Sequence, residues 1–151
     1  MNPETTLCWH PLRDSLVALR QKHLRDGGCP PHWDRVENIA GAGTPDLSWS
    51  WGGKEGHIEL KHRYDVPVGA DTPVVVSSIT PHQRLWWRQR WESGGNVHVL
   101  LRLGNEFLLF GGLWANFNLG STDLGSLRAH AQGCWDRGSL CAEEVLRSSC
   151  R

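Results

Sequence analysis

The chain has 151 residues, 39% hydrophobic and 21% charged, which is typical of one globular domain with an ordinary core. Basic and acidic residues number 16 each, so the formal net charge is +0, and this balance argues mildly against a nucleic-acid partner. No apolar run approaches the roughly 20 residues that span a bilayer, and no secretory signal is visible, so we expect a cytoplasmic protein without a membrane partner.

The first half of the chain predicts one helix followed by three strands. Leucines recur at helical spacing over residues 11–25, and the glycines and prolines of residues 27–31 end that helix. Residues 32–39 are predicted as a strand. Residues 46–51 and 57–63 alternate between apolar and polar side chains, the pattern of half-buried strands, and residues 52–56 predict the turn of a hairpin between them.

The second half predicts a loop, a helix and a second hairpin. Residues 64–79 are expected to form a long loop, with a short strand at the valines of 74–76. Thr80, Pro81 and Gln83 form a capping box with a first-turn proline and predict a helix over residues 80–93. Residues 97–103 and 106–110 are apolar strands joined by a Gly-Asn turn. Residues 119–134 and 140–146 are predicted to contain short helices.

This order of elements predicts an α/β fold with a mixed central sheet and helices packed against it. We expect a single domain over residues 1–151, with a core at about 9–112 and a C-terminal helical extension at 113–151. The five cysteines are odd in number and contain no C-x-x-C pair, which favours reduced thiols over a disulfide framework. A metal site is an alternative for four residues of unusual spacing, namely His130, Cys134, Cys141 and Cys150.

The first predicted hairpin brings together two carboxylates and one ammonium group. Glu59 and Lys61 are two residues apart on a strand and project to one face, and Asp46 approaches that face from the neighbouring strand. Hard carboxylate oxygens bind Mg²⁺ or Mn²⁺, which activates water for phosphodiester hydrolysis, and a lysine assists that water. The Leu60 carbonyl is well placed as a further metal ligand. The alternative is that Asp46 is only a turn residue and that Glu59 and Lys61 form an exposed cross-strand charge pair.

The motif GTPD at residues 43–46, followed by ELK at 59–61, resembles the PD-(D/E)XK nuclease signature. The stretches VENIAGAGTPDL, TPHQRLWWRQRWESGG and VHVLLRLGNEFLLF are similar to stand-alone VRR-NUC domains of phages and bacteria, which are relatives of archaeal-type Holliday junction resolvases. The resemblance covers roughly residues 33–112. It implies a restriction-endonuclease-like αβββαβ core and dependence on Mg²⁺ or Mn²⁺ without an organic cofactor. It also implies a homodimer that cuts branched or flapped DNA. Such a protein would act in the cytoplasm, which is the host cytoplasm if the protein is phage-encoded.

The resemblance also implies roles for individual residues. Asp46 and Glu59 are implied as metal ligands and Lys61 as a catalytic residue, and Gln83 matches a glutamine on the helix after the ExK strand, although a capping role alone explains it as well. Glu37 matches the family's VEN position and would serve as a metal ligand in place of a first-helix glutamate; here that helix offers only Asp14, Gln21 and Asp26. A salt bridge from Glu37 to Arg35 is the alternative.

The predicted helix over residues 80–93 carries a local excess of positive charge. We expect Arg84, Arg88 and Arg90, together with His62, to contact DNA, although a solvated helix face is an equal alternative for the arginines. The nine tryptophans are mostly expected in the core, but Trp86, Trp87 and Trp91 could also meet nucleobases or a partner subunit. Three functions remain open: a structure-selective DNA endonuclease, a Holliday junction resolvase proper, and a non-catalytic DNA-binding module.

Overall fold

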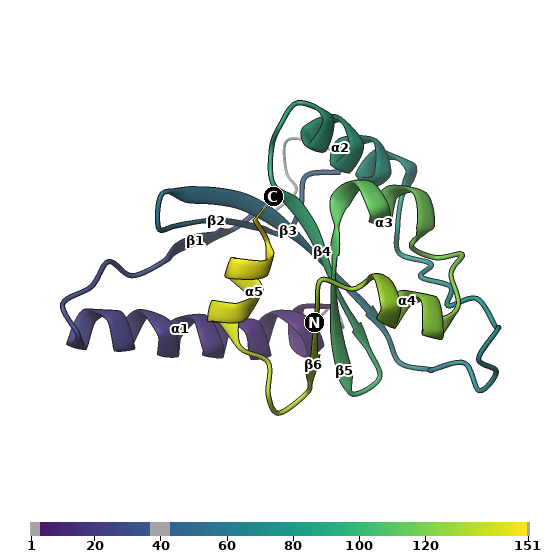
Figure 1. Cartoon of the computed structure of the whole chain (residues 1–151), viewed down its shortest axis with the longest axis horizontal. Coiled ribbons are helices and arrows are strands. Elements are labelled where there is room, and N and C mark those ends of the chain that lie inside the picture. The colour runs from purple at the N-terminus through teal and green to yellow at the C-terminus, as the bar shows by residue number, and fades with distance from the viewer. Residues whose placement is uncertain (1–3, 37–42, 151) are drawn as a thin grey trace.

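The computed structural model describes residues 4–36 and 43–150, and a six-stranded mixed sheet runs through them (Figure 1). In sheet order the strands are β1 (His32–Arg35), β2 (Leu47–Trp51), β3 (Lys54–Arg63), β4 (Val97–Leu103), β5 (Glu106–Gly111) and β6 (Gly133–Asp136). Strands β3 and β4 are parallel and every other neighbouring pair is antiparallel. The predicted α/β class with a mixed sheet is therefore confirmed.

Helices cover both faces of this sheet (Figure 1). One face carries the π-helical turn η1 (Thr5–Trp9), α1 (His10–Arg25) and α5 (Ala142–Ser148), and the other carries α2 (Pro81–Glu92), α3 (Gly112–Asn118) and α4 (Leu124–His130). The order α1, β1, β2, β3, α2, β4 is the predicted αβββαβ core. None of the helices in the described ranges is long and apolar enough to cross a membrane.

Strand β3 lies between the two hydrophobic cores, and one side of the strand faces each core. Ile58 and Leu60 belong to the core under α1, whereas Glu59 and Lys61 pair in register with Val99 and Leu101, which belong to the core under α2. The predicted alternation is confirmed, but the polar side of β3 is buried as well, because α2 and the segment before it cover that side. Glu59 and Lys61 are thus buried charged residues, which are uncommon in proteins.

The first hairpin is tighter than predicted. Trp51 pairs with Lys54, so the turn consists of two glycines, Gly52 and Gly53, whose φ angles are +60° and +77°. Two positive φ angles define the type I′ turn, whose twist matches that of the flanking strands. The prediction of a turn over residues 52–56 was wrong, since residues 54–56 already pair with β2. Strand β1 ends at Arg35 rather than at 39, and residues 37–42 lie outside the described part.

Two other expectations were also wrong. The valines of residues 74–76 form no strand: Pro73 makes one isolated bridge to Asp123, and Val74 and Val76 are instead buried under α2. The segment 113–151 is not purely helical, because β6 extends the central sheet and Trp135 pairs with Phe107. Helix α5 packs on α1, and its first residues are held by a hydrogen bond from the Ala142 N–H to the Ser15 hydroxyl at 2.8 Å. This segment therefore completes the sheet and core.

Candidate active site

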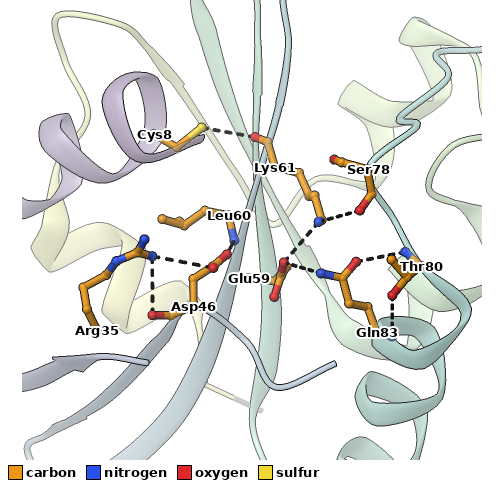
Figure 2. A network of polar contacts seen from close by, with 9 residues as sticks. All are labelled: Cys8, Arg35, Asp46, Glu59, Leu60, Lys61, Ser78, Thr80 and Gln83. Atoms are coloured by element: carbon orange, nitrogen blue, oxygen red, sulfur yellow. Dashed lines mark hydrogen bonds and ion pairs between the residues drawn. The ribbon is translucent and has the colours of Figure 1, made fainter. Parts of the chain in front are cut away.

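Asp46 stands just before β2 and reaches β3 beyond the last paired residues of the hairpin, Leu47 and Ile58. Its Oδ2 accepts a hydrogen bond from the Leu60 N–H at 2.9 Å (Figure 2). The N–H and C=O of one strand residue point to the same side of the strand, so the Leu60 carbonyl also faces the Asp46 side. The hairpin thus places a carboxylate and a main-chain carbonyl beside each other, as the sequence predicts.

Glu59 is 2% exposed and lies between the hairpin and α2. Its Oε1 accepts a hydrogen bond from Gln83 Nε2 at 3.0 Å and pairs with Lys61 Nζ at 3.2 Å (Figure 2). Its Oε2 is buried and meets no donor in the described ranges. Burial, followed by the nearby Asp46 carboxylate, raises the pKa of Glu59 to about 8, even though Lys61 acts in the opposite direction. At neutral pH this shift favours the protonated form of Glu59 unless a cation replaces the proton.

Lys61 is 3% exposed, and its side chain bridges β3 and the segment that leads into α2. Its ammonium group donates to the Ser78 carbonyl at 2.9 Å besides pairing with Glu59. On the other side of the strand, the Cys8 thiol of η1 donates to the Lys61 carbonyl at 3.2 Å (Figure 2). Burial raises the pKa of this thiol to about 12. The backbone and side chain of Lys61 are both fixed, so its ammonium has one position relative to Glu59.

Gln83 makes the capping contacts and also reaches the candidate site. Its Oε1 accepts from the Thr80 N–H at 2.9 Å, and its own N–H donates to Thr80 Oγ1 at 3.2 Å, which completes the predicted capping box. Its Nε2 remains available and donates to Glu59. The two interpretations are therefore compatible, because an amide side chain presents an acceptor and a donor at opposite ends. The start of α2 is tied directly to the site.

The substitution Gln83→Glu is expected to separate these roles. The introduced carboxylate retains the acceptor of the capping box but lies beside Glu59, which raises the pKa of Glu59 further. We expect thermal stability at acidic pH to stay near that of the unchanged protein, while the pH dependence of DNA cleavage moves to higher pH. Gln83→Ala is the matched variant and should lose about 1 kcal/mol of stability. An unchanged pH profile for Gln83→Glu would restrict Gln83 to capping.

The oxygen atoms at this site fit a hard divalent cation. Asp46, Glu59 and the Leu60 carbonyl supply oxygen ligands, the type that Mg²⁺ and Mn²⁺ prefer. The buried Glu59 Oε2 has no hydrogen-bond partner within the described residues, so it is free to accept a cation. Within residues 4–36 and 43–150, no three His, Cys, Asp or Glu side chains gather as a metal site, so the donor set described consists of two carboxylates and one carbonyl.

The third carboxylate that the resemblance implies is not placed by the structure. Glu37 lies outside the described residues. The acids of the first helix do not replace it: Asp14 is exposed and pairs with Arg13 at 2.9 Å, and Asp26 is exposed at the helix end. Gln21 is also exposed. The assignment of Glu37 as a metal ligand therefore stays a prediction.

Sequence analysis did not predict the contact between Arg35 and Asp46. Arg35 Nη1 lies 3.7 Å from Asp46 Oδ1 and 3.5 Å from the Asp46 carbonyl (Figure 2). The antiparallel register places Arg35 opposite Leu47, one residue from Asp46, so a correct strand register would have revealed it. The guanidinium also lies 5.1 Å from the centre of the Trp9 ring. Arg35 thus places a positive charge beside Asp46, one of the two carboxylates predicted to bind the metal.

The structure places two of the predicted DNA contacts away from the candidate site. Arg84 turns away from the site and donates to the carbonyls of Ala115, Asn116 and Leu119 at 3.1, 2.7 and 2.5 Å, where it caps the end of α3. His62 follows the strand alternation and lies on the side of Leu60, opposite to Glu59, with its ring against Tyr64 at 4.2 Å between centroids. Burial lowers its pKa. Neither side chain faces the candidate site.

Arg84→Ala should therefore affect folding more than DNA binding. Removing its guanidinium leaves three carbonyls at the α3 end without their charged donor, which should cost roughly 2 kcal/mol of unfolding free energy. Arg88→Ala is the matched variant, because its exposed pair with Glu92 (2.8 Å) contributes only about 0.3–0.5 kcal/mol. Urea unfolding and DNA-binding anisotropy measure the two effects. Unchanged stability with weakened DNA binding would restore Arg84 as a DNA contact.

The remaining arginines and the tryptophans of α2 occupy different environments. Arg88 and Arg90 are exposed, and the Arg90 guanidinium lies 5.0 Å from the centre of the Trp86 ring. Trp87 is fully buried in the core under α2, which excludes it from contact with nucleobases. Trp91 is half-buried against His98, at 5.8 Å between ring centroids. Trp86 is also half-buried and lies 5.2 Å from His57, on the same side of the sheet as Glu59.

Comparisons with known proteins found a structural likeness but no match to a family model or a curated protein. No protein-family model matches the sequence, and no curated protein matches it. Among solved structures, the chain is similar to that of Archaeoglobus fulgidus Hjc, a Holliday junction resolvase from an archaeal hyperthermophile. The two are 17% identical, with a TM-score of 0.49, and the match covers 79% of this chain and 90% of that chain. A likeness at this level is too distant to assign an activity.

Proposed function

We propose that this protein is a Mg²⁺- or Mn²⁺-dependent DNA endonuclease that hydrolyses phosphodiester bonds in branched, flapped or nicked DNA. The observation that supports this most directly is the buried Glu59, whose Oε2 meets no donor in the described part of the chain and whose carboxyl lies near that of Asp46. Burying such a group costs several kcal/mol, and strongly shifted carboxyls of this kind concentrate at functional sites. The PD-(D/E)XK-like motif supplies the same residues independently.

Each residue of the site has a distinct task in this proposal. Asp46, Glu59 and the Leu60 carbonyl would hold the metal ion, which supplies an activated water and neutralises phosphate charge when bound. Gln83 orients the Glu59 carboxylate by donating to Oε1. Lys61, fixed by the Ser78 carbonyl and by Glu59, orients the attacking water and stabilises negative charge that develops on the phosphoryl oxygens.

The test is cleavage of a labelled panel of linear duplex, single strand, nicked duplex, flap and four-way junction, with Mg²⁺ or with Mn²⁺. The variants are Glu59→Gln and the matched control Glu106→Gln, which removes a strand carboxylate that pairs with Arg128 at 2.7 Å, away from the site. Metal-dependent cutting that is lost only in Glu59→Gln supports the proposal. Symmetric paired nicks in the junction alone would favour a resolvase proper. DNA binding without cutting in either metal would favour a non-catalytic module.

A further inference from the structure

Helix α2 lies along β3 so that successive turns of the helix meet successive site-facing residues of the strand. At the first turn Gln83 contacts Glu59. One turn later Trp86 contacts His57, two residues before Glu59 on the strand. Arg90 follows a further turn along, with its guanidinium over the Trp86 ring. The row of contacts therefore continues from Glu59 towards the hairpin turn. Two residues of a strand span roughly 7 Å, which is the spacing between Glu59 and His57 along this row.

This row opens into a cavity of about 740 Å³. Its walls come from the β2–β3 hairpin, the end of α2, the turn before β4 and Cys150 after α5, and its polar side chains include those of Ser48, Glu55, His57, Arg90, Ser93 and Asn96. A shallower hollow of about 400 Å³ adjoins it and shares Arg90 and Ser93, with Trp86 in its wall. Cavities of about 300–1,000 Å³ suit small organic ligands. The space admits a nucleotide unit but not a double helix.

Arg90 supplies the charge that suits a phosphate at this cavity. The cavity's charged lining residues are Lys54, Glu55 and Arg90; Arg90 and Glu55 lie on the α2 side of the sheet, whereas strand alternation places Lys54 on the side of Ile58. Over the described ranges, neither cation forms an ion pair, in contrast to Arg88, which pairs with Glu92. The stem of Arg90 packs closely on Gly95, where an added Cβ would lie 2.9 Å from the Arg90 Cγ. Arg90 is therefore the arginine of α2 that lines the cavity, with its stem packed on Gly95 and no ion pair within the described ranges.

The aromatic group beside Arg90 adds a second type of contact. Trp86 is half-buried and forms an edge-to-face pair with His57. Burial, followed by the charge of Arg90, lowers the pKa of His57. An indole beside a guanidinium is the combination that binds single-stranded nucleic acid, because the base stacks on the ring while the cation meets the backbone phosphate.

We propose that this cavity binds one unpaired nucleotide next to the scissile phosphate, with its backbone phosphate on Arg90 and its base against Trp86. The inference rests on the proposed nuclease function and specifies its substrate: DNA with a single-stranded segment adjoining the cut, such as a flap. An intact duplex cannot place a base there without unpairing it, which costs energy. Selectivity for flapped over blunt duplex DNA thus arises at the end of α2.

The experiment measures binding of a labelled flap and a matched blunt duplex by anisotropy in EDTA, so that no cutting occurs. Arg90→Gln and Trp86→Leu are compared with Arg88→Gln, which removes the same charge from the same helix. We expect Arg90→Gln and Trp86→Leu each to weaken flap binding about tenfold and duplex binding no more than Arg88→Gln does. In metal, KM for the flap should rise by a similar factor while kcat is retained.

A fluorescent base analogue at the unpaired position reports stacking directly. Its emission should fall on binding to the unchanged protein and to Trp86→Phe, but not to Trp86→Leu, and thermal unfolding verifies that each variant is folded. Equal effects of Arg90→Gln and Arg88→Gln on both DNAs, with no change in base emission, would overturn the cavity assignment even if Glu59→Gln abolishes cutting. Selective flap binding without any metal-dependent cutting would instead overturn the nuclease function and leave the cavity assignment standing.

Discussion

Replacing Glu59 by glutamine should abolish cleavage and, in the same molecule, stabilise the metal-free fold. Glutamine resembles the protonated carboxyl and avoids a buried charge, but it is a poor ligand for a hard cation. We expect cleavage to fall by at least about a thousandfold, which corresponds to the loss of several kcal/mol of transition-state stabilisation. Most single substitutions destabilise a protein, so a gain in stability together with a loss of function would be diagnostic of a site residue.

The stability change has a defined pH dependence. The pKa of Glu59 rises from 4.5 to about 8 on folding, so the folded state binds a proton that the unfolded state releases. The stabilisation from this proton is complete below pH 4.5 and is lost as pH rises towards 8. Glu59→Gln should therefore be more stable than the unchanged protein by on the order of 2 kcal/mol at pH 7. Urea unfolding in EDTA at pH 5 and pH 8 measures the difference.

The control for this experiment is Glu106→Gln, which removes a surface ion pair with Arg128. It should lose at most about 1 kcal/mol and cut DNA normally. A Glu59→Gln protein that is less stable than the unchanged protein at pH 8 would contradict the view that Glu59 is a strained, functional carboxyl. It would indicate instead that the contacts of Glu59 with Lys61 and Gln83 dominate its contribution to folding.

Affinity for Mn²⁺ should rise steeply with pH and level off near pH 8. Metal binding requires Glu59 to lose its proton, so below its pKa the association constant should increase about tenfold per pH unit. The pKa of about 8 places this rise between roughly pH 6 and pH 8. Calorimetry in buffers of different ionisation enthalpy should detect about one proton released per bound ion at pH 6.5.

Lys61→Met provides the matched variant for the pH profile. The ammonium group lowers the pKa of Glu59, and its removal should move the rise in affinity to higher pH without removing a metal ligand. An affinity for Mn²⁺ that is the same at pH 6 and pH 8 would show that Glu59 is not a ligand. The proposed coordination by Asp46 and Glu59 would then be wrong.

Much of the fold was predictable because long elements with a strong pattern determine it. The leucine spacing of α1, the capping box of α2 and the apolar hairpin of β4 and β5 each indicate their element locally. Strand β6 was missed because four residues, one of them glycine, carry no periodic pattern. Its position depends on Trp135, which pairs with Phe107 on β5 and donates to Glu144 of α5 at 2.6 Å. Such contacts join distant segments and leave no local signal.

The candidate site was also predictable only in part. Asp46, Glu59 and Lys61 converge through one hairpin, whose geometry follows from the sequence. The bond from Gln83 to Glu59 depends on how the crossover helix docks on β3, which no local pattern specifies. Arg84 was assigned to DNA because its destination, the end of α3, belongs to a helix that the sequence did not indicate. The position of His62 was an avoidable error, since strand alternation already placed it with Ile58 and Leu60.

The Cys8 thiol, hydrogen-bonded to the Lys61 carbonyl, has a consequence for measuring motion at the site. It is fully buried and its pKa is about 12, so a thiol reagent can modify it only when the packing behind β3 opens. Cys29 and Cys134 are exposed and should react before Cys8, with Cys134 the slower of the two because burial and Glu106 raise its pKa. The slowest phase of labelling, that of Cys8, therefore measures the rate at which the packing behind β3 opens, and a ligand bound at the candidate site on the opposite side should make this phase slower.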